Sequence, residues 1–401
     1  MKRNNKKIRL VYLKSRYNEF YLNKIAVGLG FDKYTGYLGL HKNNALLLKY
    51  DCLYQLYAFW VFLMIPLWYC FRLCKSIVSR LKSKRSALDG STFFLATSIA
   101  LPRVTKNAGI YDMTSKWLEL PWNLTNGISE EQRVSVFDVL SFSEIFFCFK
   151  EVLILLFWSV LRDGLKYVYT NIFAFDWYLY YLSVNKIPKG SKVVFCSHTD
   201  FWCSLLGSLT NFQTILVQHG TEMYLENKKN LKELKYVDGC DAWVGDFPVK
   251  YSHLDFVYVF SDKHYIALCN SVIANNPPYK VVGYGVTLTD VGNIDKKKIL
   301  IIGYIKNYAL QEETLLKYFQ GKGVEVYLKN HPTIPPVYYE EFQRMYDFTF
   351  INSDLFPNVD IIFSYYSTLA QTYQDMGKKV VYYDDLDFSN IDDLKLSELN
   401  I

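Results

Sequence analysis

The stretch KILIIGYIKNYALQEETLLKYFQGKGVEVYLKNHP, residues 298–332, decides the fold because it holds two apolar strand-like runs separated by a helix-length interval. The runs are Lys298–Ile302 and Val324–Leu328, and a helix is predicted between them over Glu312–Phe319. Gly321 follows that helix and suits its C-terminus. Uninterrupted apolar strands joined through helices are typical of parallel sheets covered on both faces.

The same alternation continues toward the C-terminus. A helix is predicted around Tyr339–Met345, followed by the apolar strand Val359–Phe363 and the last strand Val380–Tyr383. Between these strands Thr368 and Gln371 have the spacing of a capping box, which marks the start of another helix. The resulting β-α-β-α-β-α-β order requires a parallel sheet with right-handed crossovers.

The region before residue 286 contains a second set of strand-like runs. They are Lys192–Cys196, Gln213–Val217, Ala242–Val244, Phe256–Phe260 and Lys280–Val282, with earlier candidates at Ile8–Leu13 and Phe93–Thr97. The stretch Val286–Lys298 is polar and ends in three lysines, which indicates an interdomain linker. We therefore expect an α/β protein with two Rossmann-like domains, residues 1–285 with a helical insertion and residues 299–401, facing a shared cleft across the linker 286–298.

The composition is that of a packed globular protein. The chain has 401 residues, of which 51% are apolar and 21% charged, and its net charge of +6 is spread over the sequence rather than gathered on one element. That distribution argues against a nucleic-acid-binding protein. Eight cysteines show no metal-type or redox-type spacing and predict buried, reduced thiols. The first apolar run is short and lacks a cleavage site, so we expect no signal peptide and a cytoplasmic location.

The segment Leu56–Phe71 carries no charge, is rich in aromatic residues and is followed by a basic cluster that begins at Arg72. Its length is marginal for a transmembrane span. If Ile8–Leu13 and Phe93–Thr97 were strands of one sheet, a single crossing between them would separate them across the bilayer. The favoured interpretation is a helix or hairpin in the cytoplasmic membrane interface, with a membrane span and a buried core helix as the alternatives.

Polar residues follow several of the predicted strands, where open α/β sheets bind their ligands. In the first domain they are His198 and Asp200 after one strand and Gln218, His219, Gly220, Thr221 and Glu222 after the next. In the second domain they are Gly303, Tyr304, His331, Pro332, Ser364, Ser367 and Thr368. We expect the first set to face the acceptor and the second set to bind the donor.

Each of these residues also has a purely structural interpretation. His331 before a proline can simply end a strand, and Asp200 can cap the predicted helix Phe201–Leu209. Ser367 and Thr368 can cap a helix, although a helix N-terminus with free N–H groups is itself an anion site. The pattern Asp385-Leu386-Asp387 spells a metal-binding DxD motif but lies in an acidic stretch after the last strand, so we expect no metal and no cofactor.

Three segments in this order, LVQHGT at 216–221, LKNHP at 328–332 and IFSYYSTLAQTYQDMGKKVVYYDD at 362–385, resemble GT-B glycosyltransferases of bacterial capsule and lipopolysaccharide synthesis. The resemblance covers about residues 191–385 and is greatest to sialyltransferases and Kdo transferases. It implies that His331 contacts the donor phosphate and that Ser367 and Thr368 hold the phosphate or the cytidine of a CMP-linked donor. The acidic motif of polysialyltransferases is missing, so the resemblance does not identify the base.

The predicted activity is transfer of a sugar from a nucleotide-activated donor to a surface-polysaccharide or lipid-linked acceptor. Asp200 or His219 is the candidate base, His331 and the helix start at Ser367 and Thr368 stabilise the leaving group, and Gly303-Tyr304 gives a ligand access to the backbone. Teichoic-acid-type polymerases, which use CDP-glycerol, share the segment at 218–221 and are an alternative. A nucleotide-sugar 2-epimerase and a catalytically silent scaffold are two further alternatives.

Overall fold

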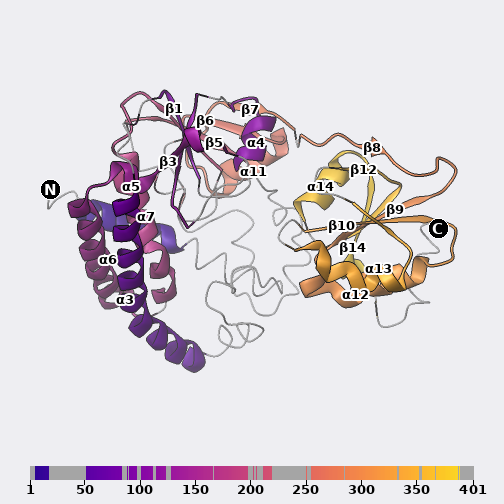
Figure 1. Cartoon of the computed structure of the whole chain (residues 1–401), viewed down its shortest axis with the longest axis horizontal. Coiled ribbons are helices and arrows are strands. Elements are labelled where there is room, and N and C mark those ends of the chain that lie inside the picture. The colour runs from indigo at the N-terminus through magenta and orange to yellow at the C-terminus, as the bar shows by residue number, and fades with distance from the viewer. Residues whose placement is uncertain are drawn as a thin grey trace. The chain divides into compact units, whose positions relative to one another are not determined.

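The computed structural model divides into two compact units, Met1–Gly283 and Tyr284–Ile401. It describes residues 5–17, 51–83, 88, 90–96, 101–111, 114–122, 128–165, 167–196, 202, 205, 211–218, 250, 254–283, 285–331, 334–351, 355–365, 367–386 and 388. Each unit is built on a parallel β-sheet (Figure 1). The predicted class, α/β with two Rossmann-like units, is confirmed.

The sheet of the first unit has the strand order β3-β2-β1-β4-β5-β6-β7 in the described part of the chain, and its neighbouring strands are parallel. The strands are β1 (Thr92–Leu95), β2 (Lys116–Glu119), β3 (Arg133–Ser135), β4 (Lys192–Phe195), β5 (Gln213–Val217), β6 (Phe256–Val259) and β7 (Tyr279–Val281). The chain runs outward from β1 to β3 and then returns to the other side of β1. This reversal is the topological switch point of a doubly wound sheet, and it lies between β1 and β4.

Helices cover both faces of this sheet. They are the helix at residues 5–17, α3 (Asp51–Lys82), α4 (Leu101–Asn107), α5 (Val136–Val139), α6 (Phe142–Asp163), α7 (Ala174–Val184) and α11 (Asp262–Ser271), with 3-10 turns η2 (Glu130–Gln132) and η3 (Val168–Phe173). Successive side chains of β1 point to opposite faces: Phe93 and Leu95 join the core under α3, α6 and α7, whereas Phe94 packs with Leu101 of α4. The continuous apolar strands in the sequence reflect this burial on two sides.

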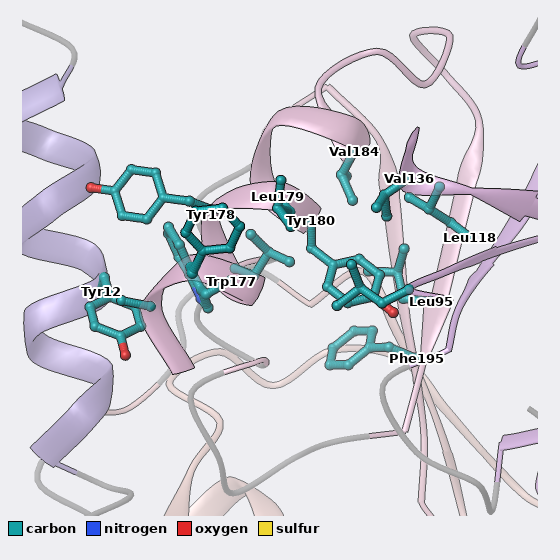
Figure 2. Close-up of a cluster of buried hydrophobic side chains, with 14 of the residues drawn as sticks. Tyr12, Leu95, Leu118, Val136, Trp177, Tyr178, Leu179, Tyr180, Val184 and Phe195 are labelled. Carbon is teal, nitrogen blue, oxygen red and sulfur yellow. The ribbon is translucent and has the colours of Figure 1, made fainter. Parts of the chain in front are cut away.

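Helix α7 lies between the sheet and the helix at residues 5–17. Figure 2 shows Tyr12 of that helix beside Trp177 of α7, while Tyr180 of α7 points toward the strand side chains Leu95 and Phe195. The rings of Tyr12 and Trp177 meet edge to face with centroids 5.3 Å apart. The helical layer is therefore two deep on this face of the sheet.

The prediction of a strand at Ile8–Leu13 was wrong, because residues 5–17 form a helix. Tyr12, Leu13 and Arg16 are buried at helical spacing. The Arg9 guanidinium pairs with the buried Glu151 carboxylate of α6 at 2.8 Å, and the Tyr12 hydroxyl donates to the Thr170 carbonyl at 2.6 Å. Residues 8–13 therefore do not belong to the sheet, and sheet pairing does not hold them on the same side of a bilayer as β1.

The Arg9–Glu151 pair gives a test of this docked helix. We expect Arg9→Ala to lower the free energy of unfolding by about 2 kcal/mol, because among the described residues the buried carboxylate of Glu151 then keeps only the long contact from Asn5 (3.5 Å). Lys14→Ala on an exposed position of the same helix should change it by less than about 0.5 kcal/mol. Urea unfolding followed by tryptophan fluorescence reads the first unit selectively, because all 8 tryptophans of the chain precede residue 284. Equal effects of the two substitutions would contradict the packing described here.

The second unit repeats the doubly wound pattern. Its sheet has the order β11-β10-β9-β13-β14, with parallel neighbours, so its switch point lies between β9 and β13. The strands are β9 (Lys298–Gly303), β10 (Glu325–Asn330), β11 (Thr349–Phe350), β13 (Ile361–Ser364) and β14 (Lys379–Tyr382). The helices are α12 (Ile305–Phe319), α13 (Glu340–Met345) and α14 (Thr368–Asp375), with 3-10 turns η5 (Pro336–Tyr339) and η6 (Tyr383–Asp385).

The segment expected to be a linker, Val286–Lys298, makes contacts within the second unit. Strand β8 (Thr289–Asp290) pairs with β12 (Pro357–Asn358) in a small parallel sheet, and the Asn293 N–H donates to the Glu325 carboxylate at 3.1 Å. The predicted strand Ala242–Val244 lies outside the described residues.

Candidate functional site

The carboxyl edge of the second sheet gathers the predicted donor-side residues from three adjacent strands. Gly303 at the end of β9 lies opposite Asn330 on β10, and Ser364 at the end of β13 lies opposite Ile302 on β9. The residues that follow these strands, Tyr304, His331 and Tyr365, therefore leave the sheet at the same edge and around the switch point. This is the place where doubly wound sheets bind nucleotides.

His331 and Tyr304 lie next to each other at this edge. Their ring centroids are 5.0 Å apart, and both side chains are partly exposed. The His331 N–H donates to the Gly303 carbonyl at 2.8 Å, and the His331 carbonyl accepts from the Ile334 N–H at 2.9 Å. The backbone of His331 is thus fixed on both sides, one strand away from the switch point, with its imidazole beside Tyr304.

Ser364 and Ser367 form a short polar turn between β13 and α14. The Ser364 hydroxyl donates to the Tyr365 carbonyl at 2.6 Å and lies 3.2 Å from the Ser367 hydroxyl. Ser367 is the N-cap of α14 and accepts from the Ala370 N–H at 3.1 Å. The cap therefore falls one residue earlier than the predicted capping box at Thr368, which is the first residue of the helix itself. The N-terminus of α14 opens at the sheet edge, with its dipole favouring an anion there.

The turn from β9 into α12 is held by a buried acid that the sequence analysis did not single out. Glu312, which is fully buried, accepts the Tyr304 N–H at 2.5 Å, and the Tyr339 hydroxyl accepts the Ile305 N–H at 3.1 Å. Burial raises the pKa of Glu312 to about 8, and the hydrogen bonds from Tyr339 and from the Tyr304 backbone offset only part of that shift. The first N–H groups of α12 are thereby satisfied inside the protein.

Gly303 has a packing role in this turn. A Cβ at this position would lie 2.4 Å from the Tyr339 hydroxyl oxygen and 3.0 Å from a carboxylate oxygen of Glu312. The space beside Gly303 is thus filled by side chains of the same unit, and the N–H of Tyr304 is already bonded. Ligand access to the backbone at Gly303 and Tyr304 stays a prediction, and the Tyr304 N–H is not available for it in this structure.

A cluster of tyrosines extends the edge beyond Tyr304. The rings of Tyr308 and Tyr365 stack with centroids 5.3 Å apart, and Tyr308 also meets Tyr383 at 5.4 Å. Tyr365 and Tyr383 are buried, whereas Tyr304 and Tyr308 are partly exposed. The backbone of Tyr308 departs from helical geometry inside α12 (φ −127°, ψ 25°), which marks a kink beside the cluster. Only Tyr304 of this group was predicted, since tyrosine is common throughout the chain.

The predicted acceptor-side residues follow β4 and β5 of the first unit. Residues 197–200 come after β4, one of the two strands at the switch point, and residues 219–222 come after the neighbouring β5. His198, Asp200, His219, Gly220, Thr221 and Glu222 lie outside the described residues, as does Pro332 of the second unit. Their assigned roles stay predictions.

Gln218 is the one predicted acceptor-side residue that the structure describes. It is buried, its backbone N–H donates to the Tyr258 carbonyl at 2.9 Å, and its side-chain oxygen accepts the Phe260 N–H at 3.0 Å. These bonds join the ends of β5 and β6, and the predicted contact of Gln218 with an acceptor stays a prediction.

Comparisons with known proteins find distant structural similarity. A wall teichoic acid polymerase, TagF, is 12% identical over 79% of this chain and 78% of its own, with a TM-score of 0.34. A UDP-N-acetylglucosamine 2-epimerase from Rickettsia bellii is 11% identical over 72% of this chain and 77% of its own, with a TM-score of 0.31. No protein-family model and no curated protein sequence matches the chain. At these levels of similarity, function has to be argued from the residues of this chain.

Proposed function

We propose that this protein is a GT-B glycosyltransferase that moves a sugar from a nucleotide-activated donor, CMP-linked by preference, to a surface-polysaccharide or lipid-linked acceptor. The observation that carries the proposal is the gathering of His331, Tyr304, Ser364 and Ser367 at the switch point of the second sheet. Two doubly wound units in one chain are also the parts of a GT-B enzyme.

The described residues suit a phosphate leaving group. The N-terminus of α14 supplies N–H groups and a favourable dipole, and the hydroxyls of Ser364 and Ser367 lie beside it. The N–H groups of Tyr304 and Ile305 at the start of α12 are bonded to Glu312 and Tyr339. We therefore assign the donor phosphate to α14 rather than α12, with the partly exposed ring of Tyr304 as a surface against which a nucleobase can pack.

The proposed reaction develops negative charge on the departing phosphate and releases a proton from the acceptor hydroxyl. The bond between the sugar carbon and the phosphate oxygen breaks, CMP leaves with the electron pair, and the acceptor oxygen forms the new bond to that carbon. The acceptor proton passes to a base, for which Asp200 and His219 are the candidates. His331 and the α14 terminus stabilise the negative charge that develops on the departing phosphate.

A nucleotide-binding panel tests the proposal most directly. We expect CMP to raise the midpoint of thermal unfolding more than UDP does, because a ligand at 100 times its Kd stabilises the folded state by about 2.7 kcal/mol. The Ser367→Ala variant should show a smaller shift with CMP than the wild type. Tyr338→Ala, at an exposed position of the same unit, is the matched control and should keep the full shift.

The alternative activities are distinguished by the same nucleotide-binding panel together with assays of substrate conversion. A larger shift with UDP, together with conversion of a UDP-N-acetylhexosamine in the absence of any acceptor, would show a 2-epimerase. Incorporation of glycerol phosphate from CDP-glycerol would show a polyol-phosphate transferase. A chain whose unfolding midpoint is unchanged by CMP, CDP and UDP is a scaffold, and the transferase proposal then fails.

A further inference from the structure

Helix α3 exposes a continuous apolar face to the solvent. We call this the α3 face; it consists of Leu53, Leu56, Phe59, Trp60, Leu63, Met64, Leu67, Phe71, Val78 and Leu81, which are 41–71% exposed. These side chains recur every three or four residues, so they share one side of the helix. Cys52, Cys70 and Cys74 are exposed on the same helix, which corrects the expectation that the cysteines are mostly buried. At about 1.5 Å per residue, the face runs for roughly 40 Å.

The opposite side of α3 is fixed to the first unit along most of its length. Ala58, Val61, Ile65 and Tyr69 are buried in the core that α3 shares with α6 and α7. The Tyr69 hydroxyl donates to the Asn171 carbonyl at 2.5 Å. Gln55–Lys82 is long and apolar enough to cross a membrane by length and composition. A crossing would strip this side of its protein contacts, whereas a helix lying flat keeps them.

The apolar surface continues from α3 onto α6. Phe157 of α6 is half exposed, and its ring lies edge to face with Phe62 of α3 at a centroid distance of 5.8 Å. Phe146 and Leu161 of α6 are also exposed. Figure 1 shows the two helices side by side at the edge of the first unit. The surface is therefore wider than one helix, as binding to an extended partner requires.

The charges on α3 have a single sign over Gln55–Lys82. This segment contains no acidic residue, and its basic residues are Arg72, Lys75, Arg80 and Lys82. Arg72 pairs with Asp176 of α7 at 3.4 Å and Arg80 is buried, so Lys75 and Lys82 are the cations that a partner can reach. The Arg72 guanidinium lies 4.5 Å from the centroid of Trp68 and 4.6 Å from that of Trp122, and the Lys75 ammonium is 5.1 Å from Trp122. Tryptophans interleaved with cations at the end of an apolar stretch are typical of the headgroup region of a membrane.

We propose that the α3 face binds the surface of an anionic lipid bilayer, with α3 lying in the plane of the interface. The apolar side chains enter the boundary between headgroups and acyl chains, and Lys75 and Lys82 at the end of the helix pair with anionic headgroups. The cations and tryptophans gathered at one end of an apolar helix face favour an anionic lipid surface as the occupant. The proposal rests on the first unit alone and does not depend on transferase activity.

Vesicle flotation with the full chain tests the proposal. We expect the protein to float with phosphatidylcholine vesicles that contain about 30% phosphatidylglycerol and to bind pure phosphatidylcholine more weakly. The double variant Leu63→Glu/Leu67→Glu should lower the partition coefficient by about tenfold or more, because it places two charges on the inserted face. The matched control, Ile294→Glu/Val337→Glu, alters two exposed apolar residues of the second unit and should bind like the wild type.

Each other outcome overturns the proposal. If the Leu63→Glu/Leu67→Glu variant floats as the wild type does, the α3 face does not bind lipid. If the wild type binds both vesicle types equally, anionic headgroups do not contribute to binding. A dimer that the double variant converts to a monomer, without vesicle binding by the wild type, would assign the face to a second copy. Retention of the cellular protein in membranes after alkaline carbonate extraction would show a span. Circular dichroism of the variants is the control for folding. The nucleotide-binding panel tests the transferase proposal and its result does not affect the test of lipid binding.

Discussion

Replacing His331 by alanine is expected to lower turnover about 100-fold or more while leaving the protein folded. The imidazole stands at the end of β10, beside Tyr304 and one strand away from the switch point between β9 and β13. In the proposed reaction it stabilises negative charge on the departing phosphate. Loss of one such donor costs roughly 2–4 kcal/mol in the barrier, by analogy with oxyanion-hole donors.

The structure explains why the His331→Ala variant should fold. The two hydrogen bonds that fix residue 331 use its backbone, to Gly303 and from Ile334, and alanine keeps both. Single-turnover transfer from the donor identified by the nucleotide panel is the measurement, with thermal unfolding measured beside it. Glu341→Ala on exposed α13 is the matched control and should keep the wild-type rate. A variant at His331 with a near-normal rate would refute the assigned role.

The stability of the second unit is expected to fall as the pH rises from about 5 to about 8, because of Glu312. The pKa of this buried carboxyl is about 8, above its ordinary value of 4.5. Between these two values the unfolded chain releases a proton that the folded protein retains, so folding becomes less favourable as the pH rises. One such group changes the free energy of unfolding by up to about 1.4 kcal/mol per unit of pH. Below pH 4.5 its contribution is fully present, and above pH 8 it has been lost.

The variant Glu312→Gln isolates this effect. A glutamine can accept the Tyr304 N–H as Glu312 does, but it does not titrate. We expect the variant to gain stability relative to the wild type as the pH rises from about 5 to about 8, between the unfolded and the folded pKa of Glu312. Urea unfolding followed by far-ultraviolet circular dichroism is suitable, since the second unit contains no tryptophan. Subtracting the wild type cancels other titrating groups, such as Asp176, whose pKa burial raises to about 6. A difference that stays constant across this range would show that Glu312 does not retain its proton.

The strands were predictable from the sequence because burial on both faces of a sheet leaves an uninterrupted apolar run. The runs at 192–196, 213–217 and 298–302 correspond to β4, β5 and β9 within one residue at each end. Ile8–Leu13 failed because a short run with five apolar residues of six fits a strand or a helix equally well. What decides between them is the pairing of Arg9 with Glu151, a contact 142 residues away along the chain.

Site residues that directly follow a strand were predictable from the sequence. Residues whose role depends on packing against distant parts of the chain were not. His331 and Ser367 were found because each follows a strand that the sequence defines. Glu312 was missed because its position in the sequence is that of an ordinary residue early in an amphipathic helix. Its burial depends on Tyr339, which η5 brings back against the start of α12. The bond from Phe260 to Gln218 was not predictable for the same reason, since it depends on the neighbouring strand.

The sequence distance between neighbouring strands sets how long each sheet stays incomplete during synthesis. In the first unit Phe93 of β1 pairs with Val193 of β4, 100 residues later, whereas in the second Ile299 of β9 pairs with Val326 and Ile361, 27 and 62 residues later. Closing the longer loop is slower, so the central strand of the first unit waits for its second neighbour until most of that unit has left the ribosome. Helix α3 emerges well before that moment, and its apolar side chains meet their surroundings while the sheet is still half built.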